Sequence, residues 1–257
     1  MLLVDDKYTI EGGRNIGTDY LGQNQWSDLD LYYQDGTLAE IENPNIFARM
    51  WNQQNAQQKL NYLNVGLKKS KWSANAKIAT IVNIPSEKSL DRIYLMKLYA
   101  IKNAKNEIDI ANAYIISTPQ MKAALIAAIE RGVKVRIYTN SSLSVDEPIV
   151  SIPIMKSVLE LQKEGAQVFL KKGKTLHTKM MRVDDLVMVE TYNMHPRSTR
   201  YEVEKSTVIT DRNMANEMKI LFDNEVNSAH ELNNADEFNI PESAELDFFF
   251  SLIFDQL

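Results

Sequence analysis

Hydrophobic positions along this chain recur with two periods, one typical of helices and one typical of strands. From Ala76 onwards the two patterns alternate, which predicts a sheet covered by helices. Gly132 and Gly165 stand where glycines commonly end helices. The expected helices span residues 89–104, 119–130, 154–163 and 213–230, and the expected strands span residues 108–114, 133–138, 167–170, 179–183, 186–189 and 206–210.

The beginning of the chain follows a shorter pattern. Apolar residues alternate on both sides of a polar turn at residues 5–7, which predicts a hairpin closed by Gly12 and Gly13. Helical spacing resumes at residues 45–55, and the polar stretch after it has no period. We therefore expect a first unit at residues 1–55, a linker at residues 56–75 and a second unit at residues 76–257.

Composition narrows the class of protein. Apolar residues make up 44% of 257 residues, which is enough for a core. A net charge of −5 gives no overall basic field and disfavours nucleic acid as a partner. Cysteine is absent, which excludes disulfides and thiol nucleophiles and leaves the compartment open. No apolar run is long enough to predict a membrane-spanning helix.

The tail LDFFFSLIFDQL contains four phenylalanines. It predicts either a helix docked on the core or an edge that faces a membrane. Docking is favoured, because large exposed apolar patches are uncommon.

The candidate chemistry lies in the string HTKMMRVDD, where His177, Lys179 and Asp184 have the spacing H-x-K-x4-D. If this segment is a strand, His177 and Lys179 share one face. An imidazole and an ammonium on one face can meet the same phosphate, as nucleophile and charge clamp. The string therefore indicates a phosphodiester-cleaving site.

The chain also repeats itself. MLLVDDKYTIEGGRN at the start matches MMRVDDLVMVETYN after Lys179, with Asp5 opposite Asp184 and Asn15 opposite Asn193. The numbering thus begins where the His and Lys of a first copy should already have passed. We expect residues 1–55 to be the C-terminal remnant of a first repeat.

These motifs resemble the phospholipase D superfamily, and within it the bacterial cardiolipin-synthase-like branch. The first unit contributes GGRNIGTDYLG and WSDLD, and the second contributes LHTK, NMHPRS and Glu204. The resemblance covers most of residues 1–55 and 76–230, but the chain has one H-x-K where the family uses two. It implies an α/β fold, a phospholipase D-like sheet flanked by helices, with one complete repeat and the remnant of another.

The resemblance also implies roles for individual residues. His177 is the nucleophile of a phosphohistidine step, Glu204 orients it, and Asp184 is mainly architectural. The catalytic set is His177, Lys179, Asp184, Asn193 and Glu204, and the substrate-binding set is Thr191, Gly12, Gly13, Asn15 and Asp28. No cofactor is implied, and with three histidines and no cysteine the sequence offers no metal cage.

Two residues depart from the family pattern. Glu190 replaces a glycine beside Thr191, and its carboxylate would repel a phosphate unless it points away. His195 stands where the family often has Asp, so it is either a stand-in acid or a histidine of a surface turn. The surface turn is the favoured interpretation.

The leading functional hypothesis is a phosphatidyl transferase or phospholipase with a phospholipid substrate, associated with a membrane surface. The missing second histidine would come from an N-terminal half or from a homodimer partner. One alternative is a catalytically inactive remnant or lipid-binding module. Another is an endonuclease-type phosphodiesterase that acts as a homodimer. The sequence does not decide the localisation.

Overall fold

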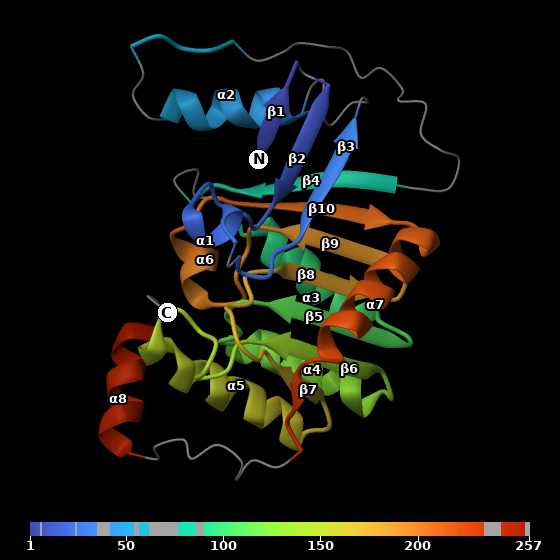
Figure 1. Cartoon of the computed structure of the whole chain (residues 1–257), viewed down its shortest axis with the longest axis vertical. Helices are drawn as coiled ribbons and strands as arrows, with labels where there is room; N and C mark the ends of the chain where they lie inside the picture. The colour runs from blue at the N-terminus through green and yellow to red at the C-terminus, as the bar shows by residue number, and fades with distance from the viewer. Residues whose placement is uncertain are drawn as a thin grey trace.

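The computed structural model describes residues 1–5, 7–23, 25–34, 42–53, 57–61, 77–85, 90–233 and 243–254. It contains an eight-stranded sheet in the order β11-β7-β6-β5-β8-β9-β10-β4 and a three-stranded sheet in the order β1-β2-β3. Figure 1 shows the small sheet above the large one. The fold is therefore the expected mixed α/β sheet flanked by helices.

Strands β5, β6 and β7 are parallel, and every other pair in the large sheet is antiparallel. The parallel strands are connected through helices, as parallel pairs require. The strands of the large sheet are β4 (Lys77–Asn83), β5 (Glu107–Asn112), β6 (Lys134–Thr139), β7 (Gln167–Leu170), β8 (Lys179–Val183), β9 (Leu186–Glu190), β10 (Glu204–Thr210) and β11 (His230–Glu231).

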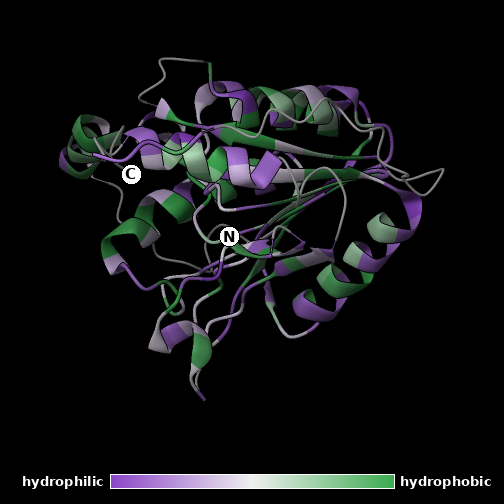
Figure 2. Cartoon of the chain, turned by 90° about the horizontal axis from the view of Figure 1, so that it is seen from above, coloured by the Kyte–Doolittle hydropathy of each residue, from purple (hydrophilic) through white to green (hydrophobic). Residues whose placement is uncertain are grey.

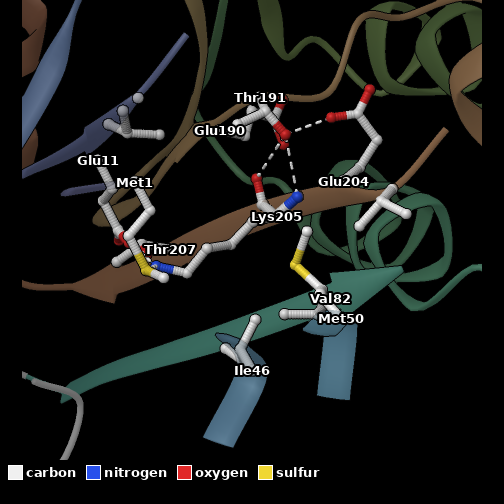
Figure 3. Close-up of a pocket in the computed structure, with 13 residues that line it drawn as sticks. Met1, Glu11, Ile46, Met50, Val82, Glu190, Thr191, Glu204, Lys205 and Thr207 are labelled. Carbon is white, nitrogen blue, oxygen red and sulfur yellow. Dashed lines mark hydrogen bonds and ion pairs between the residues drawn. The ribbon is translucent and has the colours of Figure 1, made fainter. Parts of the chain in front are cut away.

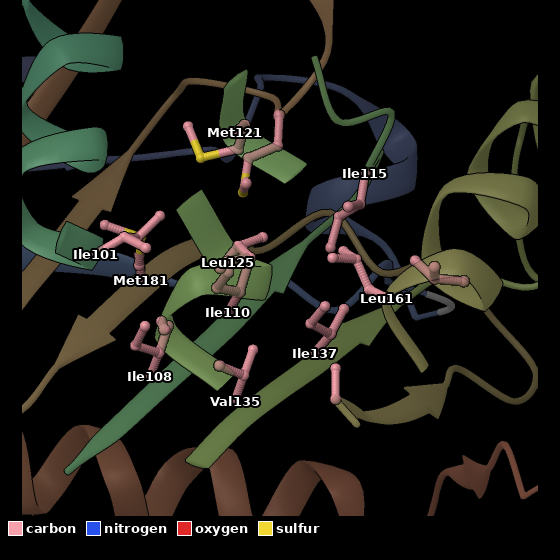
Figure 4. Close-up of a cluster of buried hydrophobic side chains, with 14 of the residues drawn as sticks. Ile101, Ile108, Ile110, Ile115, Met121, Leu125, Val135, Ile137, Leu161 and Met181 are labelled. Carbon is pink, nitrogen blue, oxygen red and sulfur yellow. The ribbon is translucent and has the colours of Figure 1, made fainter. Parts of the chain in front are cut away.

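Helices cover both faces of the large sheet. One face packs on α3 (Arg92–Asn103), α4 (Pro119–Glu130) and α5 (Ser151–Lys163), and the other packs on α7 (Arg212–Val226) and part of the small sheet. On the first face Leu125 of α4 lies over Ile110 and Ile137 of the sheet (Figure 4). The helices carry both hydrophobic and hydrophilic residues (Figure 2), as expected of elements with one buried face.

The helix ends follow local sequence signals. The side chains of Asp91, Thr118 and Asp211 accept hydrogen bonds from backbone N–H groups in the first turns of α3, α4 and α7. Gly132 and Gly165 follow α4 and α5 with φ of +84° and +107°, a region that favours glycine. Both glycines confirm the helix ends expected from the sequence.

The small sheet comprises β1 (Leu2–Val4), β2 (Tyr8–Gly12) and β3 (Asp30–Gln34), with α1 (Thr18–Leu21) and α2 (Asn43–Gln53) beside it. Its three antiparallel strands follow the same order as β8, β9 and β10. Asp5 and Asp184 adopt the left-handed conformation in equivalent turns, with φ of 55° and 51°. The similarity between the two sequence segments is thus also a similarity of local structure.

The C-terminal helix α8 (Ala244–Ile253) packs through Phe250 against Ile116 and Ile154, which confirms the expected docking. Among the described helices, none combines the length and apolar character that crossing a bilayer requires. Of the expected linker, only residues 57–61 lie within the described residues. The sequence pattern did not predict five of the elements, which are α1, β3, β4, β11 and the short helix α6 (Pro196–Arg200).

Candidate active site

His177 lies just before β8 and Lys179 opens that strand, where it pairs with Asn112 at the end of β5. Asn140, which follows β6, fixes the backbone before the histidine. Its side-chain amide donates to the carbonyl of Leu176 at 2.8 Å and its Oδ1 accepts from the N–H of Leu176 at 2.8 Å. The site therefore lies at the carboxyl edge of the parallel strands, a common place for ligands in α/β sheets.

The imidazole of His177 is held by a carboxylate from the first unit. Its Nδ1 lies 2.8 Å from Oδ2 of Asp28, whose side chain is completely buried. The N–H of Leu29 donates to the other oxygen of Asp28 at 2.8 Å. A carboxylate on Nδ1 fixes the tautomer and orientation of the ring, and it leaves Nε2 as the nitrogen that can act on a substrate.

The segment that carries Asp28 is docked by its backbone. The N–H of His177 donates to the carbonyl of Ser27 at 2.6 Å, and the N–H of Ser27 donates to the carbonyl of Thr175 at 3.0 Å. Two aromatic rings pack beside the imidazole, with centroid distances of 5.0 Å for Tyr20 and 5.8 Å for Trp26. The first unit thus completes the surroundings of the histidine.

Lys179 is buried beside His177. Its ammonium donates to the backbone carbonyl of His177 at 2.6 Å. Burial lowers the pKa of Lys179 to about 8, against the opposing influence of the Asp28 and Glu204 charges. The ammonium therefore lies against the backbone of His177 and is mostly charged at neutral pH.

Gly12 and Gly13 lie beside the segment that carries Asp28, at positions where no larger residue fits. A Cβ on Gly13 would lie 2.8 Å from Oδ1 of Asp28 and 3.0 Å from the carbonyl oxygen of His177. A Cβ on Gly12 would lie 2.3 Å from the carbonyl oxygen of Leu29. Both glycines allow the backbone of β2 to approach the segment that carries Asp28.

We expect Gly13→Ala to loosen the contact between Asp28 and His177, because the added methyl displaces the carboxylate. Phosphodiester cleavage should fall about tenfold or more, as for other small displacements of catalytic groups. The ¹⁵N resonances of the His177 ring, assigned by NMR, should shift in the same variant. Gly17→Ala is the matched control, since its Cβ meets only Tyr20 at an ordinary 3.7 Å. Unchanged rate and ring resonances in Gly13→Ala would contradict this role.

Glu204 lies on β10 and has a different partner from the one expected. Its carboxylate accepts hydrogen bonds from the hydroxyls of Thr191 and Ser198, whereas Asp28 is the residue that holds His177. The expectation that Glu204 orients His177 is therefore wrong. Burial raises the pKa of Glu204 to about 7, although the two hydroxyls oppose this. Near neutral pH this carboxyl can give or take a proton.

His195 is a buried capping residue and not a histidine of a surface turn, so that expectation is wrong. Its Nδ1 accepts from the N–H of Ser198 at 3.1 Å and caps α6. Burial lowers the pKa of His195 to about 4. The imidazole is therefore neutral at physiological pH, and an acceptor role suits that state.

Glu190 points away from His177. Its carboxylate forms an ion pair with Lys97 of α3, and both side chains are fully buried. Burial raises the pKa of Glu190, and the ammonium of Lys97 opposes this. The negative charge of Glu190, which was expected to repel a phosphate unless the side chain points away, is therefore paired with Lys97 on the face of the sheet that α3 covers.

Asp184 lies at the opposite end of β8 from Lys179, about 16 Å along the strand at 3.3 Å per residue. It accepts hydrogen bonds from the N–H groups of Lys105, Asn106 and Glu107. Burial opposes its ionisation, but these bonds hold the pKa of Asp184 below its ordinary value. The carboxylate therefore binds the backbone at the start of β5, a contact that suits the mainly architectural role expected for Asp184.

The two matching asparagines have different surroundings. The amide of Asn15 donates to the hydroxyl of Tyr20 at 3.2 Å, so it acts on the ring that packs on His177. Oδ1 of Asn193 is buried and has no hydrogen-bond donor among the described residues. This unpaired atom is an acceptor, so it suits a hydrogen-bond donor such as a hydroxyl and not an oxygen of a phosphate.

A pocket of about 140 Å³ separates the two units next to Glu204 and Thr191. Figure 3 shows Ile46 and Met50 of α2 below β10, and Lys205 reaching Glu11 beside Met1. Burial lowers the pKa of Lys205 to about 7. This ion pair, with the hydroxyl of Thr207 donating to the same carboxylate, ties β2 to β10.

Within the described parts of the chain, no group of three or more His, Cys, Asp or Glu side chains is arranged to hold a metal ion. Sequence reasoning missed Tyr20, Trp26 and Asn140 as parts of the site. The first two lie in or beside the strings GGRNIGTDYLG and WSDLD, so the motif carried a signal for them. No motif in the sequence pointed to Asn140.

The fold, with a histidine held by a carboxylate just before a buried lysine, is that of the phospholipase D superfamily. The chain belongs to the family described as "Cardiolipin synthase, PLD-like domain", whose sequence profile matches residues 98–226.

Relatives and solved structures agree with this assignment. The chain is 24% identical to cardiolipin synthase 1 of Staphylococcus aureus over 94% of this chain and 49% of the relative. It is 26% identical to the major cardiolipin synthase ClsA of Bacillus subtilis over 86% of this chain and 46% of the relative. The chain thus spans about half the length of these relatives.

Two solved structures share the fold. The first is phosphatidylserine synthase of Haemophilus influenzae, which aligns with a TM-score of 0.73 at 15% identity over 97% of this chain and 67% of that chain. The second is NucT from Helicobacter pylori, which aligns with a TM-score of 0.52 at 16% identity over 61% of this chain and 99% of that chain.

Proposed function

We propose that this chain carries the phosphodiester site of a phosphatidyl transferase, with a phospholipid as substrate and His177 as the nucleophile. The observation that carries the proposal is the 2.8 Å contact between Asp28 and Nδ1 of His177. It leaves one ring nitrogen for attack, with the ammonium of Lys179 beside the same residue. The cardiolipin and phosphatidylserine synthases among the similar proteins support the choice of a phospholipid.

In the proposed first step, Nε2 of His177 attacks phosphorus. The N–P bond forms while a P–O bond breaks, and the departing alkoxide takes a proton from water. Lys179 offsets the charge on the phosphoryl oxygens and Asn193 adds a hydrogen bond. A second alcohol then attacks the phosphohistidine and gives its proton to the hydroxide that the first step left. The new P–O bond forms while the N–P bond breaks and releases the histidine, so that the phosphatidyl group has moved between alcohols.

We further propose that residues 1–55 are the end of a first phospholipase D-like repeat, residues 56–75 a linker and residues 76–257 a second repeat. The equivalent strand order and the two left-handed aspartates at positions 5 and 184 support this division. Asp28 then belongs to the first repeat and serves the histidine of the second. Glu204 is the matching carboxylate of the second repeat, and it is left to serve a histidine from elsewhere.

The covalent step can be tested by trapping. Incubation with phosphatidylglycerol labelled in its phosphate, followed by an alkaline quench, should leave a labelled peptide that contains His177. The label should be lost in acid, because a phosphoramidate of histidine is acid-labile and alkali-stable. Mass spectrometry of the digested protein locates the modified residue.

The other two histidines of the chain provide controls. His230→Ala changes a residue on edge strand β11, and His195→Ala removes the cap of α6. Both variants should still form the adduct, and His177→Ala should not. Label on another residue, or turnover without any trapped adduct on His177, would refute the histidine mechanism.

A further inference from the structure

The carboxyl edge of the sheet, where His177 lies, also carries exposed hydrophobic side chains. Helix α8 buries Phe250 but leaves Phe248 and Leu252 exposed by 65% and 67%. Figure 1 shows α8, α1 and α6 on the same side of the molecule. The exposed side chains of α8 therefore lie on the same side of the molecule as the helices next to the site.

Contacts join α8 to the loop after β6. Tyr114 and Val145 pack with the cluster that contains Phe250, and the hydroxyl of Tyr114 donates to Asp146. Leu143, at the tip of the loop, is 83% exposed. The hydroxyl of Ser141 donates to the carbonyl of Lys171 at 3.2 Å, so the same loop touches the segment that leads to His177.

A second set of contacts continues the surface to α1. The ammonium of Lys171 donates to the hydroxyl of Ser27 at 2.7 Å, and the N–H of Trp26 donates to the carbonyl of Asp19 at 2.8 Å. Around Tyr20, whose ring packs on His177, Ile16 and Leu21 are exposed by 97% and 60%. We call Ile16, Leu21, Leu143, Phe248 and Leu252 the site rim.

Charged side chains on this edge show what kind of partner it fits. Lys172 and Lys174 are exposed in the loop between β7 and β8, directly before the histidine. Asp19, Asp146 and Glu147 are exposed on the same edge, so the field is mixed and not strongly basic. A mixed field with protruding apolar side chains suits an interface in which the apolar groups supply most of the attraction.

We propose that the site rim inserts into the surface of a lipid bilayer, with Lys172 and Lys174 at the level of the phosphates. This inference rests on the proposed function, because a phospholipid substrate lies in such a surface and must reach His177 from it. The rim side chains come from three separate segments, and contacts link these segments to one another and to the residues beside His177. Bilayer docking therefore brings the lipid headgroup to the nucleophile.

The test is binding to vesicles made of equal parts phosphatidylcholine and phosphatidylglycerol, measured by co-sedimentation. Leu143→Glu, Phe248→Glu and Leu252→Glu should each weaken binding about tenfold, the scale of one large apolar side chain. Ile220→Glu is the matched control, because Ile220 is 59% exposed on α7, away from the carboxyl edge. It should bind like the unchanged chain.

Lipid composition separates the two contributions. Lys172→Glu with Lys174→Glu should weaken binding to the mixed vesicles but not to vesicles of phosphatidylcholine alone. The proposal is overturned if the unchanged chain does not bind vesicles, or if all three rim variants bind them as tightly as the unchanged chain does. Light scattering tests whether a second copy of the chain occupies this surface instead. If the unchanged chain is a dimer that the rim variants break, and vesicles do not bind, the surface is a protein interface and the lipid proposal fails.

Failure of the surface can be told apart from failure of the proposed function. His177→Ala should bind vesicles like the unchanged chain, and Leu143→Glu should still form the His177 adduct from a water-soluble short-chain phospholipid. Vesicle binding that depends on the rim, without any adduct, keeps the surface and rejects the chemistry. Adduct formation together with vesicle binding that does not depend on the rim keeps the chemistry and rejects the surface.

Discussion

Replacing His177 with alanine is expected to lower phosphodiester cleavage by at least about 10⁴-fold, because removal of a covalent nucleophile leaves no group that can take its place. Asp28 holds this ring at 2.8 Å, and Lys179 lies against its backbone. The measurement is release of the alcohol from a labelled phospholipid under single-turnover conditions.

Asp28→Asn provides a graded comparison. The amide can still occupy the site but no longer presents a carboxylate to Nδ1, so the ring loses its fixed tautomer. The rate should fall less than in His177→Ala. If His177→Ala kept more than a small fraction of the rate, another residue would be the nucleophile.

Glu190→Leu is expected to destabilise the fold by about 3–5 kcal/mol, because it leaves the ammonium of Lys97 buried without its counter-charge. Both side chains of this pair have no solvent exposure. The free energy of unfolding, from urea titration followed by circular dichroism, measures the loss.

A double substitution separates the ion pair from packing at the same place. Lys97→Met together with Glu190→Leu removes both charges and restores an apolar contact between α3 and β9. It should recover most of the stability, as exchanges of buried ion pairs for hydrophobic residues commonly do. A double variant no more stable than Glu190→Leu would show that the charge itself does not cause the loss.

The sequence predicted the elements whose periodicity is strong. The bounds of α4, β7 and β8 agree with their apolar patterns, since each is bounded by a cap, a glycine or the H-x-K motif. α1 was missed because its four residues are too few to show a helical period, and β3 was missed although Leu29 and Leu31 alternate with polar residues. The expected helix at residues 213–230 ends earlier, at Val226, and His230 pairs in β11.

The sequence proposed residues for the site, but it did not predict which of them contact one another. His177 and Lys179 were proposed together because they lie two residues apart at the start of β8, a local relation that the sequence contains. The partner of His177 was assigned to Glu204, whereas Asp28 occupies that place. Glu204 and Asp28 are equivalent in the two copies, so the sequence could not tell which copy serves which histidine. Only the docking of the two units decides it.

The contact between Asp28 and His177 joins residues 149 positions apart. Closing such a long loop costs conformational entropy that local helices and hairpins do not pay. During refolding the sheet around β5, β6 and β8 can therefore form while the histidine is still unoriented. The protein then becomes able to act on a substrate late in refolding, after its secondary structure has formed.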